Sequence, residues 1–310
     1  MKFAIIGHLC SDVIHGQNGT ETASYGGIFY SVAAMANIAS EDDVIYPVFG
    51  VAEKDFDRVK EMMSAYPNVD AGGIYSFAGV TNEVHLFYSD KGTRTECSKH
   101  ISAPIPFSRI EDFLSVHGIL IDMISGSDIT LDTLDEVRLA VRSKNTPIHL
   151  DLHSLTLGIN ADATRFRRPL TDWRRWCFMV NSVQMNEEEA AGLSIEKYDE
   201  ESLAKQMLPL MVNTICITRG ARGATIFHQE HKHLLRKDIP GIVTGASDPT
   251  GCGDVFGAAY LFQYCRSKNA DAAAEFANEV AAVNSTLPGS SKIGELARFK
   301  VLNGVGGAGK

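Results

Sequence analysis

Residues 248–260, near the end of the chain, combine a turn of Gly and small residues with a carboxylate and an apolar, Ala-rich helical stretch. Consecutive N–H groups at the start of a helix form a cradle for an anion, and the helix dipole strengthens it. Gly251 and Gly253 let the backbone approach a phosphate without a Cβ in the way. Because Asp254 would repel a phosphate, its place in the cradle favours a base that takes the proton of an attacking hydroxyl.

This segment resembles the C-terminal motif of the PfkB, or ribokinase-like, family of sugar and nucleoside kinases. The alternative is an ordinary helix start with an acidic first turn, but the length of the matching string favours the kinase. The resemblance implies ATP as co-substrate, Mg²⁺ as cofactor and Asp254 as the general base. The N–H groups of Gly251, Cys252 and Gly253 would form an anion hole for the transferred phosphoryl group.

Asp12 follows the first predicted strand, and the carboxyl ends of parallel strands are where ligands of open α/β sheets bind. The resemblance implies that Asp12, Gly26 and Gly27 bind the sugar, while a surface loop and tight packing are the alternatives. Ser31 stands where the family usually has an Asn, which weakens any prediction of ribose specificity.

Asn186 and Glu189 match the family's N-x-x-E motif, which implies a Mg²⁺ site that acts through water. An Asn cap followed by acidic residues is also a good helix start, and both roles are compatible. Asp151 and His153 resemble a segment beside the family's active-site cleft, where we expect a structural role for the His.

The turn after the strand at 215–217 resembles the family's T-x-G-x-x-G motif. The resemblance implies nucleotide binding by four residues, namely Thr218, Gly220, Gly223 and, on a later helix, Asn278. Arg219 would add a positive charge near the phosphates. A plain β-turn and an exposed helical Asn are the alternatives. Carbonyl groups around Asp248 and Thr250 resemble a monovalent-cation site, which implies activation by K⁺.

Short apolar runs alternate with segments of helical period along the chain. Strands are expected at 3–7, 44–49, 118–121, 148–152, 178–181 and 214–218, and helices at 27–39, 55–66, 131–142 and 187–193. Such alternation predicts an α/β fold with a mainly parallel central sheet and helices on both faces. The resemblance implies one ribokinase-like domain over residues 1–310.

Two inserts, at roughly 11–25 and 72–98, break this alternation: the first is polar, the second alternates like antiparallel strands, and the two could pair into a small separate sheet. The resemblance implies a small antiparallel β lid that covers the sugar and forms the contact of a homodimer. The Gly-rich tail at 303–310 is expected to be flexible.

Composition excludes several classes of protein. A net charge of −9 argues against a general nucleic-acid binder, and no apolar stretch is long enough for a membrane span. An Arg-rich cluster at 165–175 is interpreted as a solvated segment rather than an RNA site. Scattered Cys residues suggest neither disulfides nor zinc, and we expect a cytoplasmic enzyme. Cys252, at a helix start, predicts a lowered thiol pKa and sensitivity to oxidation.

These observations predict a kinase that phosphorylates a hydroxymethyl group of a small sugar or sugar-like molecule. A nucleoside kinase of the same fold is the nearest alternative, and the apolar side chains of Phe29 and Tyr30 slightly favour a substrate with a flat group. Arg94 and Lys99 leave a phosphosugar kinase open. A silent sugar or nucleotide sensor is disfavoured because it needs no base.

Overall fold

The computed structural model describes residues 1–15, 21–88, 94–231, 233–245 and 248–300. Its centre is a nine-stranded sheet with the strand order β15-β14-β13-β12-β9-β8-β1-β4-β5. Neighbouring strands from β13 to β5 pair in parallel, whereas β14 and β15 are antiparallel. The strands are β1 (Lys2–Gly7), β4 (Val44–Ala52), β5 (Ile74–Phe77), β8 (Gly118–Asp122), β9 (Ile148–Asp151), β12 (Ser182–Asn186), β13 (Thr214–Thr218), β14 (Gly223–Glu230) and β15 (His233–Pro240). The expected α/β fold with a mainly parallel sheet is confirmed.

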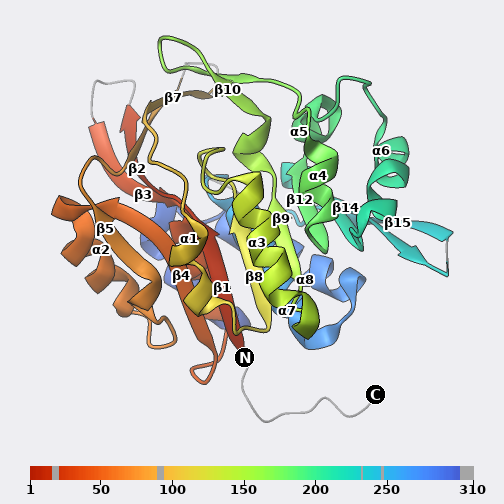
Figure 1. Cartoon of the computed structure of the whole chain (residues 1–310), viewed down its shortest axis with the longest axis horizontal. Coiled ribbons are helices and arrows are strands. Elements are labelled where there is room, and N and C mark those ends of the chain that lie inside the picture. Colours follow the sequence, from red (N-terminus) through yellow and green to blue (C-terminus); the bar gives the residue numbers. More distant parts are fainter. Residues whose placement is uncertain (16–20, 89–93, 232, 246–247, 301–310) are drawn as a thin grey trace.

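Helices cover both faces of this sheet; Figure 1 shows α3 in front of it and the blue helices α7 and α8 behind it. Helix α7 is apolar around most of its circumference because it packs between the sheet and α8. The helices are α1 (Ile28–Ile38), α2 (Glu53–Ser64), α3 (Leu131–Val141), α4 (Trp173–Phe178), α5 (Glu187–Gly192), α6 (Glu200–Met207), α7 (Cys252–Ser267) and α8 (Ala270–Asn284). No helix within the described ranges is long and apolar enough to cross a membrane.

A second sheet of four strands, in the order β3-β2-β6-β7, lies where the lid was expected, and we call this sheet the lid. Its strands are β2 (Leu9–His15), β3 (Glu21–Gly27), β6 (Asn82–Tyr88) and β7 (Arg94–His100). The central pair, β2 and β6, is parallel, so the sheet is mixed rather than purely antiparallel. Within the expected 72–98 insert, β5 instead joins the edge of the main sheet. The expected flexible tail at 303–310 lies outside the described residues.

A short hairpin, β10 (Leu157–Ile159) and β11 (Arg165–Arg167), packs against lid strand β7. The backbone N–H of Ser98 donates to the Ala163 carbonyl over 2.9 Å. The hairpin and α4 together contain most of the Arg-rich cluster, in which Trp173 and Trp176 are buried. The predicted solvated segment is therefore partly a structured connection between lid and core.

The expected strand at 178–181 is wrong: α4 ends at Phe178 and the strand is β12, Ser182–Asn186. This strand carries Gln184 in its buried middle, and a polar residue there lowers its apparent hydrophobicity. The Gln184 side chain is satisfied by hydrogen bonds to Asp151 and to the Gly253 carbonyl, so its burial has partners.

Candidate active site

A cavity of about 760 Å³ lies between the lid, the carboxyl ends of the parallel strands and the start of α7. This is where ligands of open α/β sheets bind. Most of the predicted site residues line it: Asp12, Gly27, Asn186, Thr218, Gly220, Gly223, Asp248, Thr250, Gly251, Cys252, Gly253, Asp254 and Asn278. Gly26, Ser31 and Glu189 lie behind the wall and are not among the lining residues.

The first turn of α7 faces the cavity. Gly251 precedes the helix with a φ of 72°, and a Cβ there would lie 2.2 Å from the ring of Tyr30. Glycine is therefore required both by the left-handed backbone and by the close approach of Tyr30. The N–H of Cys252 donates to the Pro249 carbonyl over 3.2 Å. Within the described part of the chain, the N–H groups of Gly253 and Asp254 have no such acceptor.

Three carboxylates meet beside this turn. Asp122, Asp151 and Asp254 come from the ends of β8 and β9 and from α7, and each offers an oxygen within 4.8 Å of the others. Burial and the charges of Asp122 and Asp151 raise the pKa of Asp254 well above its usual value. Burial likewise raises the pKa of Asp122 to about 6. Carboxylates this close resist simultaneous ionisation, so Asp254 binds a proton readily.

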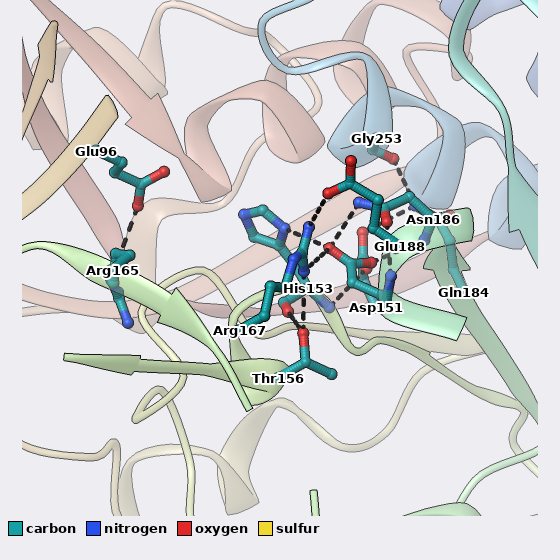
Figure 2. Close-up of polar contacts among 11 residues, drawn as sticks. Glu96, Asp151, His153, Thr156, Arg165, Arg167, Gln184, Asn186, Glu188 and Gly253 are labelled. Atoms are coloured by element: carbon teal, nitrogen blue, oxygen red, sulfur yellow. Dashed lines mark hydrogen bonds and ion pairs between the residues drawn. The ribbon is translucent and has the colours of Figure 1, made fainter. Parts of the chain in front are cut away.

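Gln184 connects this cluster to the helix. Its side-chain amide donates to Asp151 over 2.8 Å and to the Gly253 carbonyl over 2.9 Å, as Figure 2 shows. Gln184 was not among the predicted site residues, because the strand that carries it was expected at 178–181. Asp122 was not predicted either, although it is a carboxylate at the end of a buried strand, the same signal that identified Asp12.

A second group surrounds Glu189, which caps α5 together with Asn186. The two residues form a reciprocal capping box, in which Asn186 Oδ1 accepts from the Glu189 N–H over 2.9 Å. Glu189 Oε1 also lies 3.5 Å from His153 Nδ1 and 3.3 Å from Arg167 Nη1. Glu189 is thus buried among hydrogen-bond donors and does not line the cavity. Its partners Asn186 and His153 do line it.

His153 is the basic residue of the cavity wall in the described part of the chain. Burial alone would lower the pKa of its imidazole. The hydrogen bond and charge of Glu189, with the charges of Asp151 and Asp254, outweigh burial and raise the pKa to about 10. His153 is therefore an imidazolium at neutral pH and balances part of the surrounding negative charge.

The predicted reactivity of Cys252 is wrong. Burial, with the charges of Asp254 and Asp248, raises the pKa of its thiol to about 11 despite its place at a helix start. The thiol donates to the Ala281 carbonyl over 3.6 Å. Desolvation outweighs the helix dipole here, so Cys252 is a packed neutral thiol at physiological pH.

The turn between β13 and β14 lines another part of the cavity with Thr218, Gly220 and Gly223. Asn278 lies beside it and donates to the Pro240 carbonyl over 3.1 Å. The positive charge expected of Arg219 is directed elsewhere, because its guanidinium pairs with Glu187 and Glu200 and is not part of the wall.

At the lid end, the carboxylate of Asp12 packs on Gly26, where a Cβ would lie 2.0 Å from Asp12 Oδ2. Gly26 therefore makes room for the Asp12 side chain. Ser31 is buried, and its hydroxyl donates to Asp122 Oδ2 over 2.6 Å. Ser31 thus reaches the site through Asp122 and not by lining the cavity.

The loop before α7 is held by Asp248, which accepts from the Thr250 N–H and from the Gly289 N–H, each over 2.9 Å. The Thr250 carbonyl accepts from the Asn284 amide over 3.1 Å. These contacts fix the backbone in front of the helix, and activation by K⁺ stays a prediction.

Comparisons with known proteins agree with this fold. The family model described as pfkB family carbohydrate kinase matches residues 160–294. A comparison with curated protein sequences finds no match.

Solved structures resemble nearly the whole chain. A pyrophosphate-dependent kinase of the ribokinase family aligns with a TM-score of 0.75 at 17% identity, covering 93% of this chain and 96% of that one. The ribokinase of Thermotoga maritima has a TM-score of 0.73 at 19% identity, with 96% and 98% covered. A putative ribokinase II from E. coli, in complex with ATP and Mg²⁺, has a TM-score of 0.72 at 17% identity, with 96% and 98% covered. The chain therefore has the ribokinase fold over almost its full length, and its residues 160–294 match the PfkB family of carbohydrate kinases.

Proposed function

We propose that this protein is a Mg²⁺-dependent kinase that transfers the γ-phosphoryl group of ATP to a hydroxymethyl group of a small sugar or sugar-like acceptor. The observation that carries the proposal is the first turn of α7, where Asp254 and unpaired N–H groups face one cavity. A base and an anion site in one turn are what an attack by a hydroxyl on a phosphorus requires.

Asp254 is the general base. The acceptor oxygen forms a bond to the γ-phosphorus, its proton passes to Asp254, and ADP leaves with the electrons of the broken β,γ-bridge bond. Burial beside Asp122 and Asp151 makes Asp254 a stronger base than an exposed Asp, because its pKa is raised towards the working pH.

The anion hole stabilises charge on the transferred group. Gly253 and Asp254, whose N–H groups have no backbone acceptor in the described part of the chain, line the cavity at the positive end of the α7 dipole, and Gly251 shapes the turn. Each well-placed donor in such a hole contributes a factor on the order of 10²–10³ in kcat. The Cys252 N–H already donates to the Pro249 carbonyl. The turn must therefore rearrange slightly before this N–H can bind the phosphoryl group in the predicted anion hole.

Mg²⁺ fits the oxygen-rich wall of the cavity, where Asn186 and several carboxylates supply the ligand atoms it prefers. Bound with the nucleotide, it would neutralise phosphate charge. Asn186 would hold its water shell at the wall, and Glu189 would orient Asn186 through the capping box. Direct ligation by Glu189 does not fit, since both of its carboxylate oxygens accept from protein donors.

ATP is the proposed donor because the cavity continues past the anion hole along an apolar wall. Thr218, Gly220 and Gly223 border the phosphate end of this extension. Ile242, Val243 and Ala282 lie along it with Asn278, and they suit a flat base. A pyrophosphate donor, which a similar kinase uses, would leave this wall without a contact. Equal turnover with pyrophosphate and ATP would contradict the assignment.

A nucleoside kinase is the second candidate, because Tyr30 lines the acceptor part of the cavity and could stack on a base. Release of ADP from ATP and Mg²⁺, measured across sugars, phosphosugars and nucleosides, tests both candidates. Nucleotide binding without turnover of any acceptor would favour the sensor. Replacing K⁺ by Na⁺ in the same assay tests the cation site near Asp248, and an unchanged rate would remove it.

A further inference from the structure

The inner face of the lid combines carboxylates with apolar side chains. Strand register places Asp12 beside Val84 and Leu86 beside Glu96, and all four line the cavity. Since alternate residues of a strand share one face, this arrangement follows from the alternation within β2, β6 and β7. The acceptor therefore meets two acidic groups and an apolar surface on one sheet.

The cavity as a whole is acidic. Its wall in the described part of the chain contains five carboxylates, from Asp12, Glu96, Asp151, Asp248 and Asp254, and neither Lys nor Arg. Lys99 is exposed and is not part of this wall, and the side chain of Arg94 lies outside the described residues. The Lys or Arg side chains that would bind a phosphosugar are thus absent from the described wall, and the cationic group it does contain, His153, is paired with Glu189.

Arg165 is the guanidinium near this end, and it is committed to the protein. Its Nε donates to Ser98 Oγ over 2.7 Å, and its Nη2 donates to the Ser125 carbonyl over 2.9 Å. Its side chain is only 6% exposed and lies 3.8 Å from Glu96 Oε1, as Figure 2 shows. Arg165 therefore holds the lid carboxylate in position from behind and does not face the acceptor.

We propose, given the kinase function above, that the acceptor is an uncharged or amine-bearing polyol with one apolar face, and that Glu96 sets this charge preference. Hydroxyl or ammonium groups of the acceptor donate to Asp12 and Glu96, while the apolar face packs on Val84 and Leu86. A phosphate or carboxylate on the acceptor is repelled by the carboxylates of the wall.

The test uses matched compounds that differ in charge: glucose with glucosamine, fructose with fructose 6-phosphate, and adenosine with 3′-adenosine monophosphate. For each, kcat/KM is measured by ADP release, and binding is measured separately by calorimetry. In the two pairs that contain a phosphorylated compound, the wild type should favour the uncharged member at least about tenfold, as charge repulsion across an interface predicts.

Glu96→Gln keeps the shape of the side chain and removes its charge. We expect the KM for amine acceptors to rise about tenfold and the discrimination against phosphorylated ones to shrink by a similar factor, with kcat nearly unchanged. The matched control is Glu21→Gln in lid strand β3, whose side chain is 67% exposed and outside the cavity wall. This control changes the net charge equally and should leave every ratio unaltered.

Preference for a phosphorylated member, or an unchanged ratio in Glu96→Gln, would overturn the proposal. Absence of binding by all uncharged and amine compounds would overturn it too. If these compounds bind with the expected order of charge but none is phosphorylated, the charge preference stands and the kinase assignment fails.

Discussion

The first turn of α7 and the inner face of the lid line two regions of one cavity, called here the α7 end and the acceptor end, and they are built in different ways. In the α7 turn, the base and the anion site come from consecutive residues, 251–254, so the chain itself fixes their spacing. On the lid, Asp12, Val84 and Glu96 come from three strands and meet only through register. The chemistry is therefore encoded locally, and the choice of acceptor is encoded by long-range pairing.

This difference predicts how each end responds to mutation. Changes in the α7 turn should affect kcat, because these groups act on the reacting atoms. Changes on the lid should affect KM and selectivity, because these groups touch the part of the acceptor that does not react.

The largest effect is expected for Asp254→Asn, which keeps the shape of the side chain but cannot accept the proton. We expect kcat to fall by at least about 10²-fold, the low end for loss of a general base, with nucleotide binding near normal. Single-turnover kinetics and calorimetry with ATP separate the two quantities. The control is Asp132→Asn, an exposed Asp in the first turn of α3. Near-wild-type turnover in Asp254→Asn would disprove the base assignment.

Gly251→Ala tests the shape of the same turn. A Cβ would lie 2.2 Å from the ring of Tyr30, at a residue with a φ of 72°. The turn or the ring must therefore move, and a shift of about 1 Å near reacting groups lowers kcat on the order of 10²-fold. Gly289→Ala is the comparison, because its φ of 57° carries similar strain with no atom within 4 Å, and its N–H can still donate to Asp248. Equal kcat in the two variants would show that the contact with Tyr30 is unimportant.

Much of the α7 end could be predicted from the sequence because its functional residues are consecutive in the chain. A Gly-x-Gly-Asp string before an apolar helix specifies the backbone and the base together, and the wall includes all four residues. The central sheet was also predictable, because its buried strands are short apolar runs. Strand β12 is the exception, since its buried Gln184 interrupts the apolar pattern.

The acceptor end was not predictable to the same degree. Glu96 and Arg165 are 69 positions apart in the sequence, and their meeting depends on the β10–β11 hairpin packing on β7. The prediction for the Cys252 thiol failed for a related reason: its pKa is raised mainly by burial, which depends on packing against the distant helix α8, and only secondly by Asp254 and Asp248 nearby in the sequence. Local motifs reveal backbone geometry, whereas electrostatic environment requires the folded chain.

Asp122→Asn tests whether the carboxylate cluster costs stability. The folded pKa of Asp122 is about 6, against an ordinary value of 3.8. Because the folded pKa is raised, the contribution of the Asp122 carboxyl group to the free energy of unfolding is fully present below pH 4. This contribution is lost as the pH rises through about 6. The shift corresponds to about 3 kcal/mol, so the variant should gain about that much over the wild type between pH 4 and pH 7.

Urea unfolding at the two pH values measures this gain. The Ser31 hydroxyl can still donate to the amide oxygen of the variant, so packing should be conserved. A gain that is the same at pH 4 and pH 7 would mean that ionisation of Asp122 is not its cause.

Val84→Ala should have the smallest effect, and it sharpens the contrast between the two ends. Removing two methyl groups from the apolar part of the lid should raise the acceptor KM about tenfold, the lower range for small changes in a hydrophobic pocket. The kcat should stay constant, because Val84 lies on the lid and not at the α7 turn. Val13→Ala removes the same groups from the opposite face of this sheet, beside His85, and should leave KM unaltered. A drop in kcat in Val84→Ala would mean that the lid positions the reacting hydroxyl, and the separation of chemistry from selectivity would then be incomplete.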